Sequence, residues 1–109
     1  VPSPMRFVET PVFTAIIRDL LPDDEYRALQ SALLLRPEQG AIIPGSGGIR
    51  KLRWSGRGRG KRGGLRVIYF WFVSEGVVYM LYAYAKGVAD DLTPAQIKVL
   101  RGLVKEEFE

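Results

Sequence analysis

The chain has 109 residues, of which 47% are hydrophobic and 26% charged, a balance that supports one domain with a single modest core. The absence of cysteine excludes disulfides and cysteine-based metal sites, and the absence of histidine removes the commonest zinc ligand and the usual proton shuttle near neutral pH. With 16 basic and 12 acidic residues the chain is net basic, which favours a polyanionic partner such as nucleic acid.

The outer limits of the domain and its compartment follow from simple patterns. Residues 1–4 (VPSP) look like the remnant of a cleaved tag, so the expected domain covers residues 5–109. No stretch approaches the about 18 consecutive apolar residues of a membrane span, and no signal-peptide pattern is present. We therefore expect a soluble cytoplasmic protein that does not contact membranes.

The first half of the chain predicts one strand and two helices. Met5–Glu9 is a short strand candidate. Thr10 followed by proline predicts a helix N-terminus, and apolar residues continue at helical spacing to about Leu21. After Pro22, three acids open a second helix, where the helix dipole favours negative charge, and Arg36–Pro37 ends it.

The second half predicts three strands and a last helix. The strands are Ile49–Ser55, Gly64–Ser74 and Val77–Lys86, with a glycine-rich loop over Gln39–Gly48 and a two-residue hairpin turn at Glu75–Gly76. Thr93–Gln96 is a capping box that starts the final helix. The order β-α-α-β-β-β-α predicts a small single α+β domain, with a mostly antiparallel four-stranded sheet and the helices packed on one of its faces.

A cationic segment from Ile49 to Arg66 leads into the most apolar strand. No acid lies between Glu38 and Glu75, so the segment carries an uncompensated positive charge that is best explained by a polyanionic partner. Its eight basic residues are Arg50, Lys51, Arg53, Arg57, Arg59, Lys61, Arg62 and Arg66.

Strand alternation predicts which of these charges meet. Lys51 and Arg53 share one face of their strand, and Tyr82, Tyr84 and Lys86 share one face of the last strand. If the hairpin returns the end of the last strand beside the start of the preceding one, four cations from three strands converge into a phosphate site. These are Lys51, Arg53, Arg66 and Lys86.

The pattern GIRKLRW…GRGKRGGLRVIYFW…YMLYAYAKG…DDLTPAQ resembles the RelE/ParE superfamily of bacterial type II toxins, and within it the HigB-like RelE toxins. The resemblance runs from Met5 to the C-terminus and implies the RelE-like fold. It also implies a ribosome-dependent endoribonuclease, an mRNA interferase that cuts translated mRNA in the ribosomal A site and so inhibits translation. Some relatives carry a functional tyrosine after the last strand, whereas here no tyrosine follows Tyr84. Either Tyr84 substitutes for it, or another group stacks on the mRNA base.

Cleavage of RNA by attack of the 2′-OH on the adjacent phosphate requires a base, an acid for the leaving oxygen and cations for the developing charge. Lys51 or Lys86 is the candidate for proton transfer, because neighbouring arginines disfavour the charged form of a lysine and lower its pKa. Arg53 and Arg66 are expected to grip the phosphate, since a guanidinium can hold two oxygens. No metal or other cofactor is expected. Binding of RNA and ribosome is expected from Arg50, Arg57, Arg59, Lys61 and Arg62.

The resemblance further implies a cognate HigA-like antitoxin with a helix-turn-helix domain, so that operator DNA is contacted only through the antitoxin. Two alternatives stay open from the residues. A ParE-like toxin that inhibits DNA gyrase without catalysis has no need of converging lysines and arginines, and a plain RNA-binding module needs the basic loop but no fixed cation geometry. Trp54 could stack on a base, but the face that it shares with Leu52 favours the core.

Overall fold

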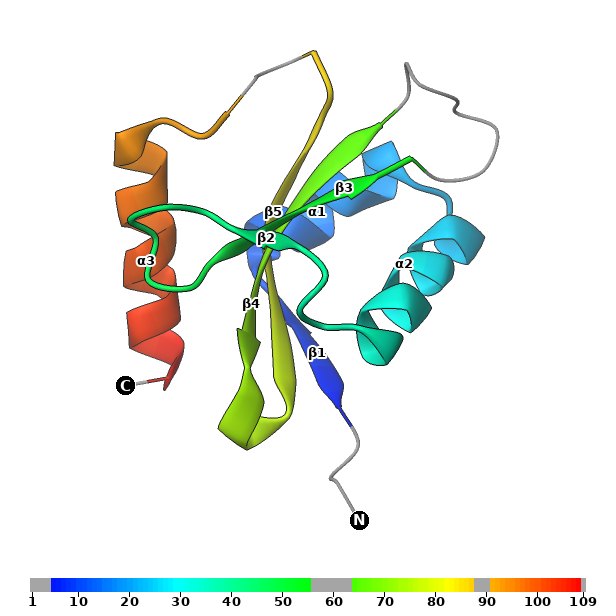
Figure 1. Cartoon of the computed structure of the whole chain (residues 1–109). Coiled ribbons are helices and arrows are strands. Elements are labelled where there is room, and N and C mark those ends of the chain that lie inside the picture. Colours follow the sequence, from blue (N-terminus) through cyan, green and yellow to red (C-terminus); the bar gives the residue numbers. More distant parts are fainter. Residues whose placement is uncertain (1–4, 56–63, 88–90, 109) are drawn as a thin grey trace.

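The computed structural model describes residues 5–55, 64–87 and 91–108, which form one five-stranded sheet and three α-helices (Figure 1). The order of strands across the sheet is β1-β5-β4-β3-β2, with β1 parallel to β5 and the other pairs antiparallel. The elements are β1 (Arg6–Glu9), α1 (Pro11–Leu20), α2 (Asp23–Leu35), β2 (Ala41–Ile42), β3 (Arg50–Trp54), β4 (Leu65–Phe72), the 3₁₀ turn η1 (Val73–Glu75), β5 (Val77–Ala85) and α3 (Pro94–Phe108).

The predicted small α+β domain is confirmed, but the predicted four-stranded sheet is wrong. The fifth strand is β2, which lies in the stretch predicted as a glycine-rich loop and pairs with the start of β3. It is only two residues long, too short to show an alternating pattern between its neighbouring glycines and proline. Its pairing with β3 gives the sheet an edge that becomes one wall of the site.

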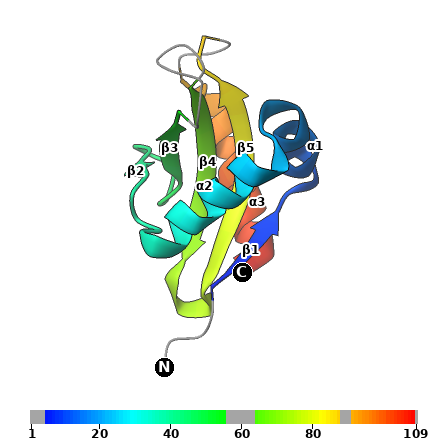
Figure 2. The ribbon, with the colours of Figure 1, turned by 90° about the vertical axis from the view of Figure 1, so that its right-hand side faces the viewer.

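The helices cover both faces of the sheet, which corrects the prediction that they pack on one face. Figure 2 shows α1 and α2 in front of the sheet and α3 behind it. The front cluster contains Phe13 and Leu33 packed with Val67 of β4, and the rear cluster contains Ile68 packed with Leu100 of α3. Because β4 and β5 are apolar on both faces, each face needs its own helical cover.

The start of α1 is tied to an irregularity in β5. The register of β4 on β5 shifts between Ile68 and Tyr69, so that Leu81 has no partner on β4. The Thr10 hydroxyl donates to the Leu81 carbonyl at 2.9 Å and accepts from the Phe13 amide at 3.0 Å, as the predicted N-cap. One buried side chain therefore satisfies both the helix end and the bulged strand.

Local signals also set the hairpin and the last helix. Thr93 and Gln96 make the predicted capping box at α3, each side chain accepting from the backbone amide of the other. The hairpin differs from its prediction. The 3₁₀ turn η1 and Gly76, which has φ of 63°, connect Phe72 to Val77, so the connection is longer than two residues.

None of the helices in the described residues has the length and apolar character that a membrane span requires.

Candidate functional site

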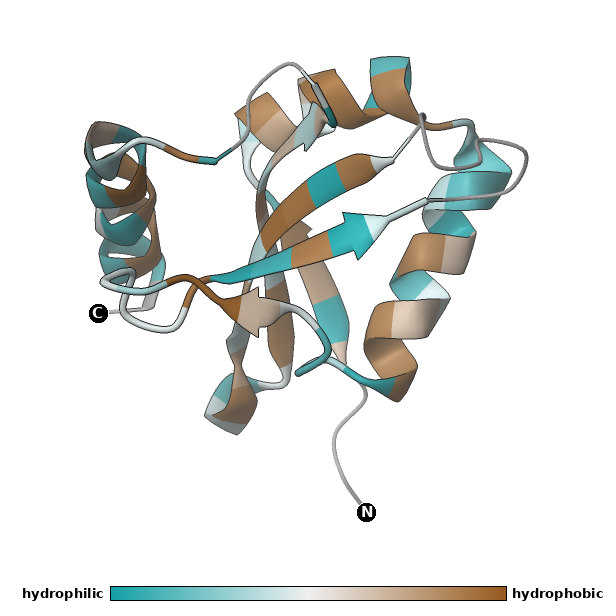
Figure 3. Cartoon of the chain, turned by 45° about the horizontal axis from the view of Figure 1, so that its top comes forward, coloured by the Kyte–Doolittle hydropathy of each residue, from teal (hydrophilic) through white to brown (hydrophobic). Residues whose placement is uncertain are grey.

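The candidate site lies on the α3 face of the sheet, where three strands place polar side chains in one row. Arg53 of β3 lies opposite Arg66 of β4, which lies opposite Tyr84 of β5. Lys51 is two residues from Arg53 and shares its face, because Leu52 between them packs into the front cluster. The alternation of hydrophilic and hydrophobic bands along β3 is visible in Figure 3. The structure thus brings together three of the four predicted cations.

Lys86, the fourth predicted cation, lies one step further from the row than expected. The observed register puts Tyr84 opposite Arg66, whereas the Lys86 backbone amide donates to the Gly64 carbonyl at 2.8 Å. The longer hairpin connection causes this offset, and the bulge at Leu81 reduces it by one residue. Lys86 is exposed and stands diagonal to Arg66, a spacing of about 7–8 Å between Cα atoms that a long side chain can still bridge.

A cleft of about 700 Å³ opens beside Lys51 and Arg53. One wall is the segment that contains β2, the floor is β3, and the other wall is the approach to α3. Its volume lies in the range of small-molecule and nucleotide sites. The lining residues are Gln39, Ala41, Ile42, Ile43, Pro44, Lys51, Leu52, Arg53, Asp91, Leu92 and Ile97. The cleft therefore combines two cations at its floor with apolar walls.

The cleft also holds an acid. The Lys51 ammonium donates to Asp91 Oδ1 at 2.7 Å, with the Lys51 side chain 21% exposed and that of Asp91 75% exposed. The hydrogen bond and charge of Lys51 hold the pKa of Asp91 below its usual value, and the charges of Arg53 and Arg66 act in the same direction. Sequence reasoning missed this contact, because the two residues are far apart in the chain.

Tyr84 lies beside Arg66 at the end of the row, and its hydroxyl is buried. Its side chain is 5% exposed, and among the described residues its Oη has no hydrogen-bond partner. Burial raises the pKa of Tyr84, while the charges of Lys51 and Arg66 lower it and that of Asp91 raises it. The phenol is therefore neutral at physiological pH, lies within electrostatic reach of the cations, and keeps a hydrogen-bond donor that no described residue uses.

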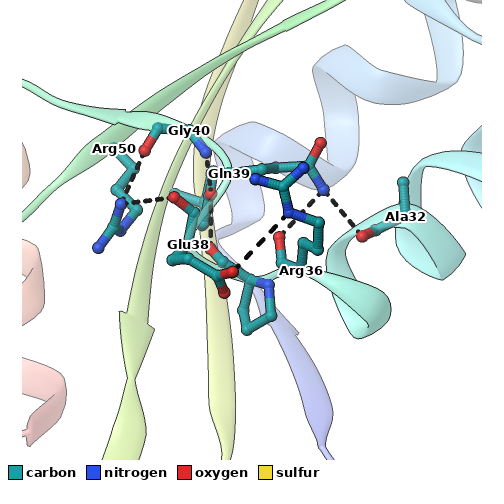
Figure 4. Close-up of polar contacts among 8 residues, drawn as sticks. Ala32, Arg36, Glu38, Gln39, Gly40 and Arg50 are labelled. Atoms are coloured by element: carbon teal, nitrogen blue, oxygen red, sulfur yellow. Dashed lines mark hydrogen bonds and ion pairs between the residues drawn. The ribbon is translucent and has the colours of Figure 1, made fainter.

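Arg50 and Trp54, by contrast, belong to the other face of β3. Arg50 Nη1 donates to the carbonyls of Glu38 and Gly40, both at 2.8 Å, and so ties down the segment after α2 (Figure 4). Trp54 packs against the front cluster, which supports the core role over base stacking. The structure thus separates Arg50 from the row of Lys51, Arg53 and Arg66.

The remaining predicted RNA-binding residues, Arg57, Arg59, Lys61 and Arg62, lie outside the described residues. In the described part of the chain, no group of three or more Asp and Glu residues is placed to hold a metal ion. No protein-family model matches the chain.

Proposed function

We propose that this chain is the toxin of a type II toxin–antitoxin system, a RelE-like, metal-independent endoribonuclease that cuts mRNA on the ribosome. The observation that carries the proposal is the row of Arg53, Arg66 and Tyr84 on one face of the sheet, with Arg53 and the neighbouring Lys51 lining a cleft. Three cations on one face of the sheet, two of them lining a cleft, are suited to a phosphodiester. The dependence on the ribosome, the cytoplasmic location and the type of partner are proposed from the resemblance in sequence.

In the proposed reaction the 2′-oxygen attacks the adjacent phosphorus, the bond from phosphorus to the 5′-oxygen breaks, and a 2′,3′-cyclic phosphate forms. Arg53 and Arg66 bind the phosphate oxygens as negative charge develops on them. Tyr84 donates a hydrogen bond from its neutral phenol. Lys51 or Lys86, as the free amine, takes the 2′-hydroxyl proton, and the ammonium so formed supplies the proton with which the 5′-oxygen leaves.

The partners in this proposal are the ribosome, its mRNA and an antitoxin of HigA-like organisation. The antitoxin covers the cationic face with acidic residues while the toxin is idle, and its helix-turn-helix domain contacts the operator DNA. Ribosomal RNA is gripped by the basic residues between β3 and β4, which act as diffuse countercharge. Arg66 acts differently, because it starts the central strand and its backbone is fixed by neighbours on both sides.

Primer extension on mRNA tests the proposal, with and without ribosomes, for the wild-type protein, Arg66→Ala and Arg27→Ala. We expect cuts only with ribosomes, and we expect Arg66→Ala to reduce the single-turnover rate about 10²- to 10³-fold with little change in ribosome binding. Arg27 is exposed on α2, so Arg27→Ala removes the same charge and is expected to behave as wild type.

The other outcomes point elsewhere. Intact mRNA together with inhibition of DNA gyrase favours the ParE-like alternative, and ribosome or RNA binding without cuts favours a plain RNA-binding module. Substitution of both Arg57 and Arg59 by Ala is expected to weaken ribosome binding and to flatten its salt dependence, without loss of the rate at saturation. If that double variant is inactive at saturation while Arg66→Ala cuts normally, the catalytic cations are not those of the strand row.

A further inference from the structure

The cations of the cleft already hold an anion, and it belongs to the chain itself. Asp91 Oδ1 accepts the hydrogen bond from Lys51, and the charges of Arg53 and Arg66 also reach this carboxylate. A carboxylate and a phosphodiester each carry one negative charge and offer oxygens that accept from ammonium and guanidinium groups. The Asp91 carboxylate is thus a chemical stand-in for the phosphate that such a site would bind.

The position of Asp91 is set by the start of α3. Leu92 packs beside the rear cluster, and Thr93 next to it is locked in the capping box with Gln96. The backbone at Asp91 is therefore anchored on its C-terminal side. The side chain itself is 75% exposed, so it can rotate out into water without a change in the fold.

We propose that the Asp91 carboxylate occupies the place of a phosphate group in the cleft, and that a phosphodiester of single-stranded RNA displaces it from Lys51. The choice of RNA as the ligand depends on the proposed function; the competition between Asp91 and a phosphate depends only on the ion pair and the cations around it. Exposed ion pairs are weak, so a ligand with several phosphates can displace the carboxylate at a small cost in binding free energy. A lone anion has fewer contacts with which to replace the carboxylate. Asp91 then favours polymeric over small anionic ligands.

Two simpler roles for Asp91 make opposite predictions. If the carboxylate mainly aligns Lys51 for its ligand, its removal weakens binding. If it serves only as an ionic tie between β3 and the approach to α3, its removal lowers stability and leaves affinity unchanged. Competition with a phosphate alone predicts tighter binding when the carboxylate is neutralised.

The test is fluorescence anisotropy with a labelled, single-stranded 2′-O-methyl RNA hexamer, whose blocked 2′-oxygens prevent cleavage. We expect Asp91→Asn to bind about two- to five-fold more tightly than wild type at low salt, the size of effect that one exposed charge pair supports. Asp91→Ser is expected to shift affinity in the same direction. The matched control is Glu107→Gln, which makes the same charge change near the far end of α3.

A second pair of variants locates the effect. In a Lys51→Gln background, Asp91→Asn is expected to change affinity no more than Glu107→Gln does, because the competed cation is gone. Equal affinities of Asp91→Asn and Glu107→Gln in the wild-type background, or weaker binding by Asp91→Asn, overturn the inference.

The binding measurement separates this inference from the proposed function. If Asp91→Asn binds the hexamer more tightly but the wild-type protein does not cleave mRNA on ribosomes, the proposed ribonuclease activity is refuted and the competition by Asp91 is supported. If cleavage depends on Arg66 but Asp91→Asn leaves the affinity for the hexamer unchanged, the competition by Asp91 is refuted and the ribonuclease activity is supported.

Discussion

The wall of the cleft formed by β2 depends on one buried hydroxyl, which makes Tyr69→Phe an informative change. Tyr69 is 0% exposed, its Oη accepts from the Gly40 amide at 2.9 Å, and it donates to the Pro37 carbonyl at 2.7 Å. Burial raises the pKa of Tyr69, so the phenol keeps the proton that it donates. Phenylalanine preserves the ring and leaves a buried N–H and a buried C=O without this partner.

The expected loss follows from those two groups. An unsatisfied buried backbone group costs about 1–3 kcal/mol, and entry of water recovers a share, so we expect Tyr69→Phe to lower the free energy of unfolding by about 2–4 kcal/mol. Urea denaturation measures this value, and amide hydrogen exchange should show faster exchange at Gly40.

Tyr82→Phe is the matched control for this change, because Tyr82 is partly exposed and packs on the opposite side of the sheet. It is expected to alter the free energy of unfolding by less than about 0.5 kcal/mol. A loss of less than about 0.5 kcal/mol in Tyr69→Phe as well would refute the idea that this hydroxyl secures the wall.

Two further predictions concern stability. Thr10→Ala removes both the N-cap of α1 and the donor to the bulged Leu81 carbonyl, and is expected to lower the free energy of unfolding by about 2–3 kcal/mol in the same urea assay; a value below about 0.5 kcal/mol would contradict the double role. Alkaline pH should destabilise the fold, because the pKa values of Tyr69, Tyr79 and Tyr84 are all raised above 10.0, chiefly by burial. The unfolded chain loses these protons first, so the stabilisation is complete below about pH 10 and is lost as the pH rises through the higher folded values. Tyr84→Phe should make the fall in stability between pH 9 and 11 shallower, and an unchanged slope would exclude Tyr84 as a contributor.

The parts of the fold that could be predicted are those encoded by neighbours in the chain. Two helix starts could be predicted because the capping side chain and the amide that it accepts from are within three residues of each other. These are the starts at Thr10–Pro11 and at Thr93–Gln96. Alternation along β3 likewise separates Lys51 and Arg53 from Leu52 whatever the sheet around them. The face that carries the three cations was therefore visible from sequence.

The parts that could not be predicted depend on contacts between distant segments. The contact of Lys51 with Asp91 requires the chain to return over the cleft after two further strands. The bulge at Leu81 shifts the register by a single residue, and no local residue type marks it. Helical cover on both faces did have a signal, since the unbroken apolar run from Val67 to Val73 is typical of a strand buried on both sides.

The fold fixes some parts of the candidate site more rigidly than others, which bears on the proposed cleavage. Arg66 of β4 is paired on both sides, with Arg53 of β3 and Tyr84 of β5, so its backbone is fixed by the centre of the sheet. Tyr84 lies beyond the part of β5 that pairs with β1, but its side chain is held by burial. Lys51 and Arg53 lie on β3, where β2 pairs with only the first two residues, Arg50 and Lys51, so that Arg53 lies beyond this ladder. Asp91 stands outside the sheet with most of its side chain in water. Groups that must stabilise a transition state need fixed positions, whereas groups that admit or release a ligand need freedom to move. The rigidity of these positions falls from Arg66 and Tyr84 outwards to Asp91, in line with that division. The groups proposed to contact the transition state lie on the central strands, and the carboxylate proposed to be displaced lies at the edge of the site.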